Sequence, residues 1–80
     1  MSYTDRQKEL VIDLINKQLN TLKESIEYRE KEIKYNLKKL PHQNKLMEAT
    51  ILHTNGEHHI KLAEYVADKF NLESVLKTLI

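Results

Sequence analysis

The residues of this sequence that could do chemistry are concentrated in one short stretch, HTNGEHH, at residues 53–59. The stretch contains the only glycine and three of the four histidines. On a helix, His53 and Glu57 lie one turn apart on the same face, which is a workable spacing for two metal ligands. A zinc site needs three or four ligands, and nothing in the sequence brings a third one close. We therefore expect no metal.

Nucleophilic catalysis has no candidate set of residues. The chain has no cysteine, and a single glycine cannot build a phosphate-binding loop. Ser2, Ser25 and Ser74 belong to no pattern that is typical of a catalytic triad. The carboxylates lie mostly at the i,i+4 spacing of surface ion pairs. The sequence therefore favours a protein that is not an enzyme and needs no cofactor.

Arg29 is the most specific polar signal, because it occupies a step of an otherwise apolar helical pattern. Two roles are open. It can make an interhelical hydrogen bond or salt bridge that sets the register, as polar residues at such positions do. Alternatively it can capture an anion or a nucleotide, and the candidate ligand-binding residues are then Arg29, His53, Asn55 and His59.

The elements that must position these residues are long helices, since one glycine and one proline in 80 residues leave little to break them. Thr4 and Gln7 fit a capping box. Apolar residues then recur at steps of three and four, at Ile12, Ile15, Leu19, Leu22, Ile26, Ile33 and Leu40. This pattern predicts a first helix over about residues 5–40, which ends before Pro41.

A second helix is predicted over about residues 42–70, antiparallel to the first because the connection is short. A second stepped pattern runs through the glycine without a change of phase, at Leu46, Ala49, His53, Gly56, Ile60, Ala63, Ala67 and Phe70. We therefore expect this line to face the first helix, with Gly56 leaving a notch for Arg29. The alternative is two shorter helices that meet at Gly56.

Residues 72–79 are predicted as a short third helix, with Asn71 as its cap. Its apolar residues Leu72, Val75, Leu76 and Leu79 have helical spacing. It is expected to cover the N-terminal end of the first helix, in its own subunit or in a neighbouring one. The predicted fold is all-α, a coiled-coil-like helical hairpin that forms a single domain of residues 1–80.

A chain of this length buries too little apolar surface to be comfortably stable alone, so we expect a homodimer or a higher homo-oligomer. A further apolar stripe is expected to stay free for a partner protein, at Leu52, Leu62, Tyr65 and Val66. The 13 basic and 12 acidic residues create no overall field that favours nucleic acid. No apolar run is long enough to span a bilayer, and a cytoplasmic location is expected.

Two segments, VIDLINK at 11–17 and KLAEYVA at 61–67, resemble small phage helical-hairpin proteins that sequester cyclic nucleotide signals of antiphage defence. The resemblance covers the hairpin and implies nucleotide binding. The residues themselves favour a regulatory interaction protein of the inhibitor, antirepressor or adaptor type, which self-associates and binds a partner through a helical face. Binding of a small anionic ligand at Arg29 is the alternative.

Overall fold

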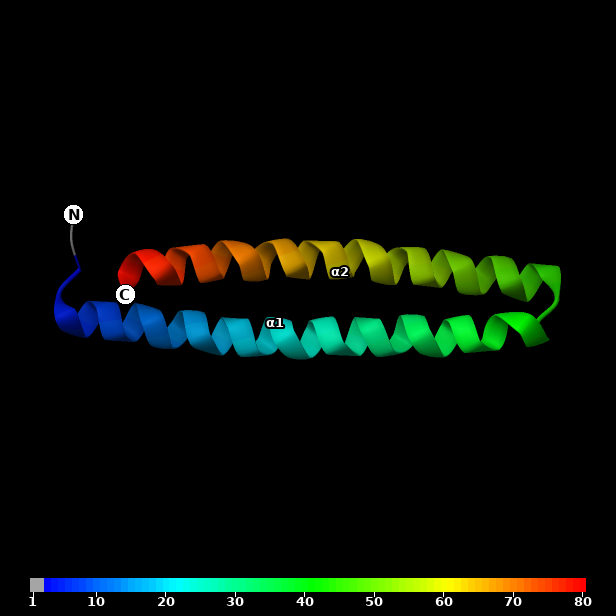
Figure 1. The fold of residues 1–80 in the computed structure, drawn as a ribbon, viewed down its shortest axis with the longest axis horizontal. Helices are drawn as coiled ribbons and strands as arrows, with labels where there is room; N and C mark the ends of the chain where they lie inside the picture. The colour runs from blue at the N-terminus through cyan, green and yellow to red at the C-terminus, as the bar shows by residue number, and fades with distance from the viewer. Residues whose placement is uncertain (1–2) are drawn as a thin grey trace.

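The computed structural model describes residues 3–80, apart from the side chain of His42. The chain folds into α1 (Asp5–Lys39), a short 3-10 turn η1 (Leu40–His42) and α2 (Lys45–Leu79). The two long helices lie side by side and antiparallel, and they form a rod of 60 × 17 × 13 Å (Figure 1). The predicted all-α helical hairpin is confirmed. None of the helices in the described part is long and apolar enough to cross a membrane.

α1 begins where the capping pattern predicts. The backbone N–H of Gln7 donates to Thr4 Oγ1 at 3.2 Å, and the backbone N–H of Thr4 donates to Gln7 Oε1 at 2.9 Å. These two bonds satisfy amide groups that the first turn of a helix leaves without partners. At the other end, Lys38 and Lys39 lie in the last turn, where positive charge interacts favourably with the helix dipole.

α2 begins at Lys45 rather than at residue 42, because Leu40–His42 form the 3-10 turn. Asn44 is the cap of α2, and its Oδ1 accepts from the backbone N–H of Met47 at 2.9 Å. Pro41 lies in the first part of the 3-10 turn, where its missing N–H costs no helical hydrogen bond.

The prediction of a separate helix over residues 72–79 is wrong. α2 continues without a break to Leu79, so that Asn71 lies inside the helix rather than at a cap. No glycine or proline interrupts this part of the chain. Both helices have 35 residues, so α2 itself covers the N-terminal part of α1. The apolar residues expected in a third helix therefore complete the same interface.

The line of α1 that faces α2 is the predicted one. Ile15, Leu22 and Ile33 are buried, and the residues between them on this line are half-buried. Gly56 lies within an uninterrupted helix, as predicted, and its φ is not positive.

The line of α2 that was predicted to face α1 instead faces away from it. Leu46, Ile60 and Phe70 are 76%, 62% and 70% exposed. The residues that pack against α1 are buried or half-buried and follow another stepped line, Ile51, Asn55, His58, Leu62, Tyr65, Leu72, Leu76 and Leu79. Both lines have helical spacing, and spacing alone does not choose between them. The observed line places more large apolar side chains inside, which gains more free energy from burial.

Candidate functional site

Two asparagines form a polar layer between the helices. Asn36 Nδ2 donates to Asn55 Oδ1 at 2.9 Å, and Asn55 Nδ2 donates to the carbonyl oxygen of Ile33 at 3.3 Å. Asn55 is only 4% exposed. Because both polar atoms of its amide have partners, the buried side chain carries little desolvation penalty. This layer fixes how the two helices are aligned.

Arg29 and His58 form a second polar contact about two turns away along α1. Arg29 Nη1 lies 2.8 Å from His58 Nδ1, and His58 is 9% exposed. A guanidinium group only donates hydrogen bonds, so Nδ1 of His58 accepts this one and the ring proton is on Nε2. The Tyr28 ring meets His58 edge to face, with ring centroids 6.5 Å apart, and Arg29 Cζ lies 5.7 Å from the Tyr28 centroid.

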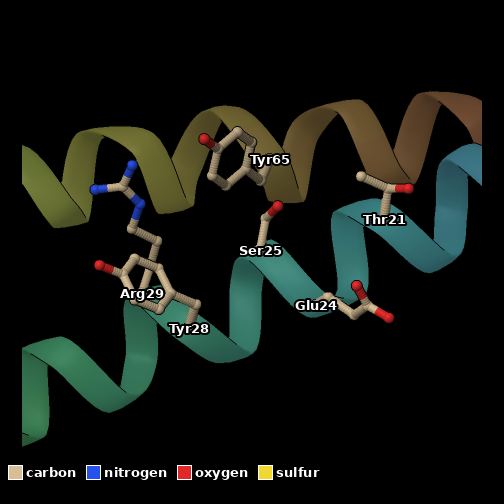
Figure 2. Close-up of a pocket in the computed structure, with 6 residues that line it drawn as sticks. All are labelled: Thr21, Glu24, Ser25, Tyr28, Arg29 and Tyr65. Atoms are coloured by element: carbon tan, nitrogen blue, oxygen red, sulfur yellow. The ribbon is translucent and has the colours of Figure 1, made fainter.

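A shallow hollow lies beside this contact. Figure 2 shows Arg29 and Ser25 reaching from α1 towards α2, Tyr65 beside them on α2, and the Glu24 carboxylate pointing away. The volume of the hollow is about 250 Å³, and it is lined by Thr21, Glu24, Ser25, Tyr28, Arg29 and Tyr65. Pockets that enclose a small molecule are typically ~300–1,000 Å³. A single chain could therefore contact a small ligand on one side and offer it the Arg29 guanidinium, but it would not enclose the ligand.

The four predicted ligand-binding residues do not converge on this hollow. Arg29 lines it, whereas Asn55 is buried against Asn36. His53 and His59 are exposed, and His53 Nε2 lies 3.2 Å from Glu57 Oε1. The residues described by the structure contain no cluster of three or more histidine, aspartate or glutamate side chains that could hold a metal.

The predicted notch at Gly56 is wrong. An added Cβ at this glycine would meet nothing within 4 Å, because Gly56 lies on the exposed side of α2. The partner of Arg29 is His58, which was not among the predicted site residues. Its signal was available: His58 lies seven residues from Ile51 and Tyr65, on the line that faces α1.

The four predicted partner-binding residues lie on two sides of α2. Leu62 and Tyr65 are half-buried on the line that packs against α1, so they are largely used within the hairpin. Leu52 and Val66 are about half exposed, at 49% and 50%. They border the side of α2 that faces away from α1.

This side is an exposed apolar surface of α2, and we call it the outer face. Its residues are all exposed and are Leu46, Ala49, Leu52, Gly56, His59, Ile60, Ala63, Val66, Ala67 and Phe70. α2 is thus apolar on two opposite sides. A helix that is apolar all round is normally covered on all sides, and α1 covers only one of them.

Comparison with models of known protein families, with curated proteins and with solved structures finds no match for this chain. The fold and the site describe an antiparallel helical hairpin that has a polar layer between its helices and an exposed apolar face on α2.

Proposed function

We propose that this chain is a non-enzymatic interaction protein of the inhibitor, antirepressor or adaptor type, which self-associates and binds a partner protein through a helical face. The observation that carries the proposal is the outer face of α2. Leu46, Ile60 and Phe70 are each more than 60% exposed on one side of a single helix. Contiguous apolar surface of this kind in a protein is typical of a site for another protein chain.

The energetics of the hairpin support the same proposal. Within the described chain only Ile15, Leu22, Ile33 and Ile51 form a buried hydrophobic core, and none of the large side chains is fully buried. Helices in proteins are stabilised mainly by packing of an apolar face, and small scaffolds rarely obtain enough from one thin core. Covering the outer face would add apolar burial at about 25 cal/mol per Å².

Sedimentation over a range of protein concentrations tests self-association. We expect the wild-type chain to sediment as a species heavier than 9.5 kDa, and Ile60→Glu to shift it towards the monomer because a carboxylate is then buried. Thr54→Glu is the matched control, since Thr54 is exposed on another side of α2, and it should sediment like the wild type. Circular dichroism checks that both variants stay helical.

A tagged chain expressed in its native host tests the partner. We expect a specific protein to co-purify with the wild type and with Thr54→Glu. A wild-type chain that remains monomeric at all concentrations and retains no protein would contradict the proposal.

A second candidate function is binding of a small anion or a nucleotide, favoured by the hollow between Tyr28, Arg29 and Tyr65. Aromatic rings and a guanidinium group are suited to stacking on a base and to pairing with a phosphate. Because one chain does not enclose the hollow, a second subunit would have to complete it.

Thermal unfolding in the presence of nucleotides, cyclic dinucleotides included, tests this candidate. A ligand that binds only the folded chain raises the unfolding midpoint. We expect stabilisation of the wild type and its loss in Arg29→Gln, with Lys31→Gln as an exposed control on the same helix. Absence of any shift at millimolar ligand would exclude the candidate.

A further inference from the structure

We infer that the occupant of the outer face of α2 is a second copy of this chain, which lies antiparallel to the first about a two-fold axis near His59. The inference rests on the self-association proposed above. It adds the surface, the orientation and the register of the contact.

One edge of the outer face carries a regular series of side chains. Lys45, Leu52, His59, Val66 and Glu73 follow one another at intervals of seven residues, and all five are exposed. Seven residues are close to two full turns of a helix. These five side chains therefore form a nearly straight line along α2, which we call the edge line.

The edge line is complementary to itself when its direction is reversed. With His59 of one copy opposite His59 of the other, Lys45 lies opposite Glu73 and Leu52 lies opposite Val66. Each pairing occurs twice because of the two-fold symmetry, as in any isologous contact. A parallel pair in the same register would instead place lysine against lysine and glutamate against glutamate, which is unfavourable.

The middle of the outer face fits the same arrangement. In this register Gly56 lies within one residue, about 1.5 Å along the helix, of the level of Ala63 in the other copy, and the two Ile60 residues lie within two residues of each other. Small residues along the middle allow two helices to approach closely, while the larger Leu52, Ile60 and Val66 fill the space on either side.

Several carboxylates of α2 bear on this pairing. On the side of α2 away from the edge line, Glu57 lies 3.2 Å from His53 and Glu64 lies 3.4 Å from Lys61, so these carboxylates have partners within the helix. Glu73 contacts Lys69 at 3.5 Å, but its side chain is 48% exposed. It therefore keeps an accessible carboxylate oxygen for Lys45 of the other copy.

The chain exposes more area than a compact monomer of its mass, which leaves room for an interface. A compact monomer of this mass, 9.5 kDa, exposes about 5,000 Å², whereas this chain exposes 6540 Å². The difference, roughly 1,500 Å², is about twice the ~800 Å² that each partner buries in a standard stable interface.

Cysteine cross-linking tests the orientation, because the natural chain has no cysteine. In the antiparallel register Leu52 faces Val66, and the two copies of Leu52 lie about 21 Å apart, at 1.5 Å per residue. A short thiol-specific cross-linker should therefore join His59→Cys to itself. It should join a mixture of Leu52→Cys and Val66→Cys chains, but not Leu52→Cys alone. Thr54→Cys, about 140° around the helix from His59 at 3.6 residues per turn, is the control that should not cross-link.

Charge reversal tests the register independently. Lys45→Glu or Glu73→Lys alone should weaken dimerisation roughly tenfold, since two ion pairs become two repulsions. The double variant Lys45→Glu/Glu73→Lys should restore the wild-type affinity. Sedimentation measures the affinity, and circular dichroism confirms helicity.

The outcomes separate this inference from the proposal on which it rests. A wild-type dimer in which Leu52→Cys cross-links to itself, or in which the double charge variant stays weak, overturns the antiparallel register and leaves self-association standing. A wild-type chain that is monomeric at every concentration overturns both.

Discussion

Asn55 shows how a polar side chain can be built into a thin apolar interface. Its amide donates to the Ile33 carbonyl oxygen and accepts from Asn36. A displacement of one helix along the other would break both bonds and leave buried polar groups without partners. The asparagine pair therefore opposes alternative alignments of the helices, a role that buried polar residues have in coiled coils.

We expect Asn55→Ala to lower the free energy of unfolding by about 1–3 kcal/mol, the usual cost of leaving a buried polar partner unsatisfied. Chemical denaturation followed by circular dichroism measures the change. Asn71→Ala is the matched control, because Asn71 is an exposed asparagine on the same helix, and it should change the stability by less than about 0.5 kcal/mol. Equal effects at the two positions would show that the polar layer contributes nothing specific.

At the level of single residues, the sequence predicted which side chains of α1 make interhelical contacts, but not their partners. An interhelical hydrogen bond that sets the register was one of the two roles open for Arg29, and Arg29 does make a hydrogen bond to α2. Its partner is His58 rather than a residue beside Gly56, and the contact between Asn36 and Asn55 was not predicted. The cause is the orientation of α2 about its own axis. The predicted hairpin placed the wrong side of α2 against α1, so every expected pairing between the two helices is displaced.

The two helices differ in how clearly their sequences indicate which side is buried. α1 has one apolar line that repeats along most of its length, and its exposed apolar residues, such as Leu10, Leu14 and Leu37, form no second line of that length. Its inner line could therefore be predicted. α2 has two apolar lines of similar spacing on opposite sides. Periodicity identifies α2 as a helix and predicts its continuity through Gly56. It does not determine which side faces α1, since that depends on the total apolar area buried by each choice.

The start of a helix was predictable where a side chain accepts a hydrogen bond from a free backbone N–H group of the first turn. Thr4 and Gln7 form the expected capping box. α2 begins at Lys45 rather than at about residue 42 because Asn44 provides its cap. The continuation through Asn71 was missed, since an asparagine after an apolar line is compatible with a cap and with an exposed position inside a helix.

We expect Asn44→Ala to cost about 1 kcal/mol of stability, because the Met47 amide loses its acceptor. Asn44→Gly should cost only a few tenths of a kcal/mol, since glycine is tolerated at this position. Denaturant unfolding of the two variants at the same protein concentration gives the comparison. If both variants cost the same, the side-chain cap does not contribute to the start of α2.

At the scale of the whole molecule, the hairpin is unusually extended for its length. Its radius of gyration is 18.2 Å, whereas a compact domain of 80 residues has about 12 Å. Such a shape exposes a large area relative to the mass. Shape and apolar patterning thus lead to the same expectation, that the functional form contains more than one chain. The sequence leads to the same expectation, but the surface that we propose for it depends on the orientation of α2, which periodicity does not determine.

The position of the chain ends has a further consequence. The start of α1 and the end of α2 lie at the same end of the rod, and the connection between the helices lies at the other (Figure 1). In the two-fold pair proposed above, these ends of the two copies would lie at opposite ends of the assembly. Modules attached at these ends of the two copies would then be separated by about one rod length, 60 Å. The pair would therefore act as a spacer of fixed length.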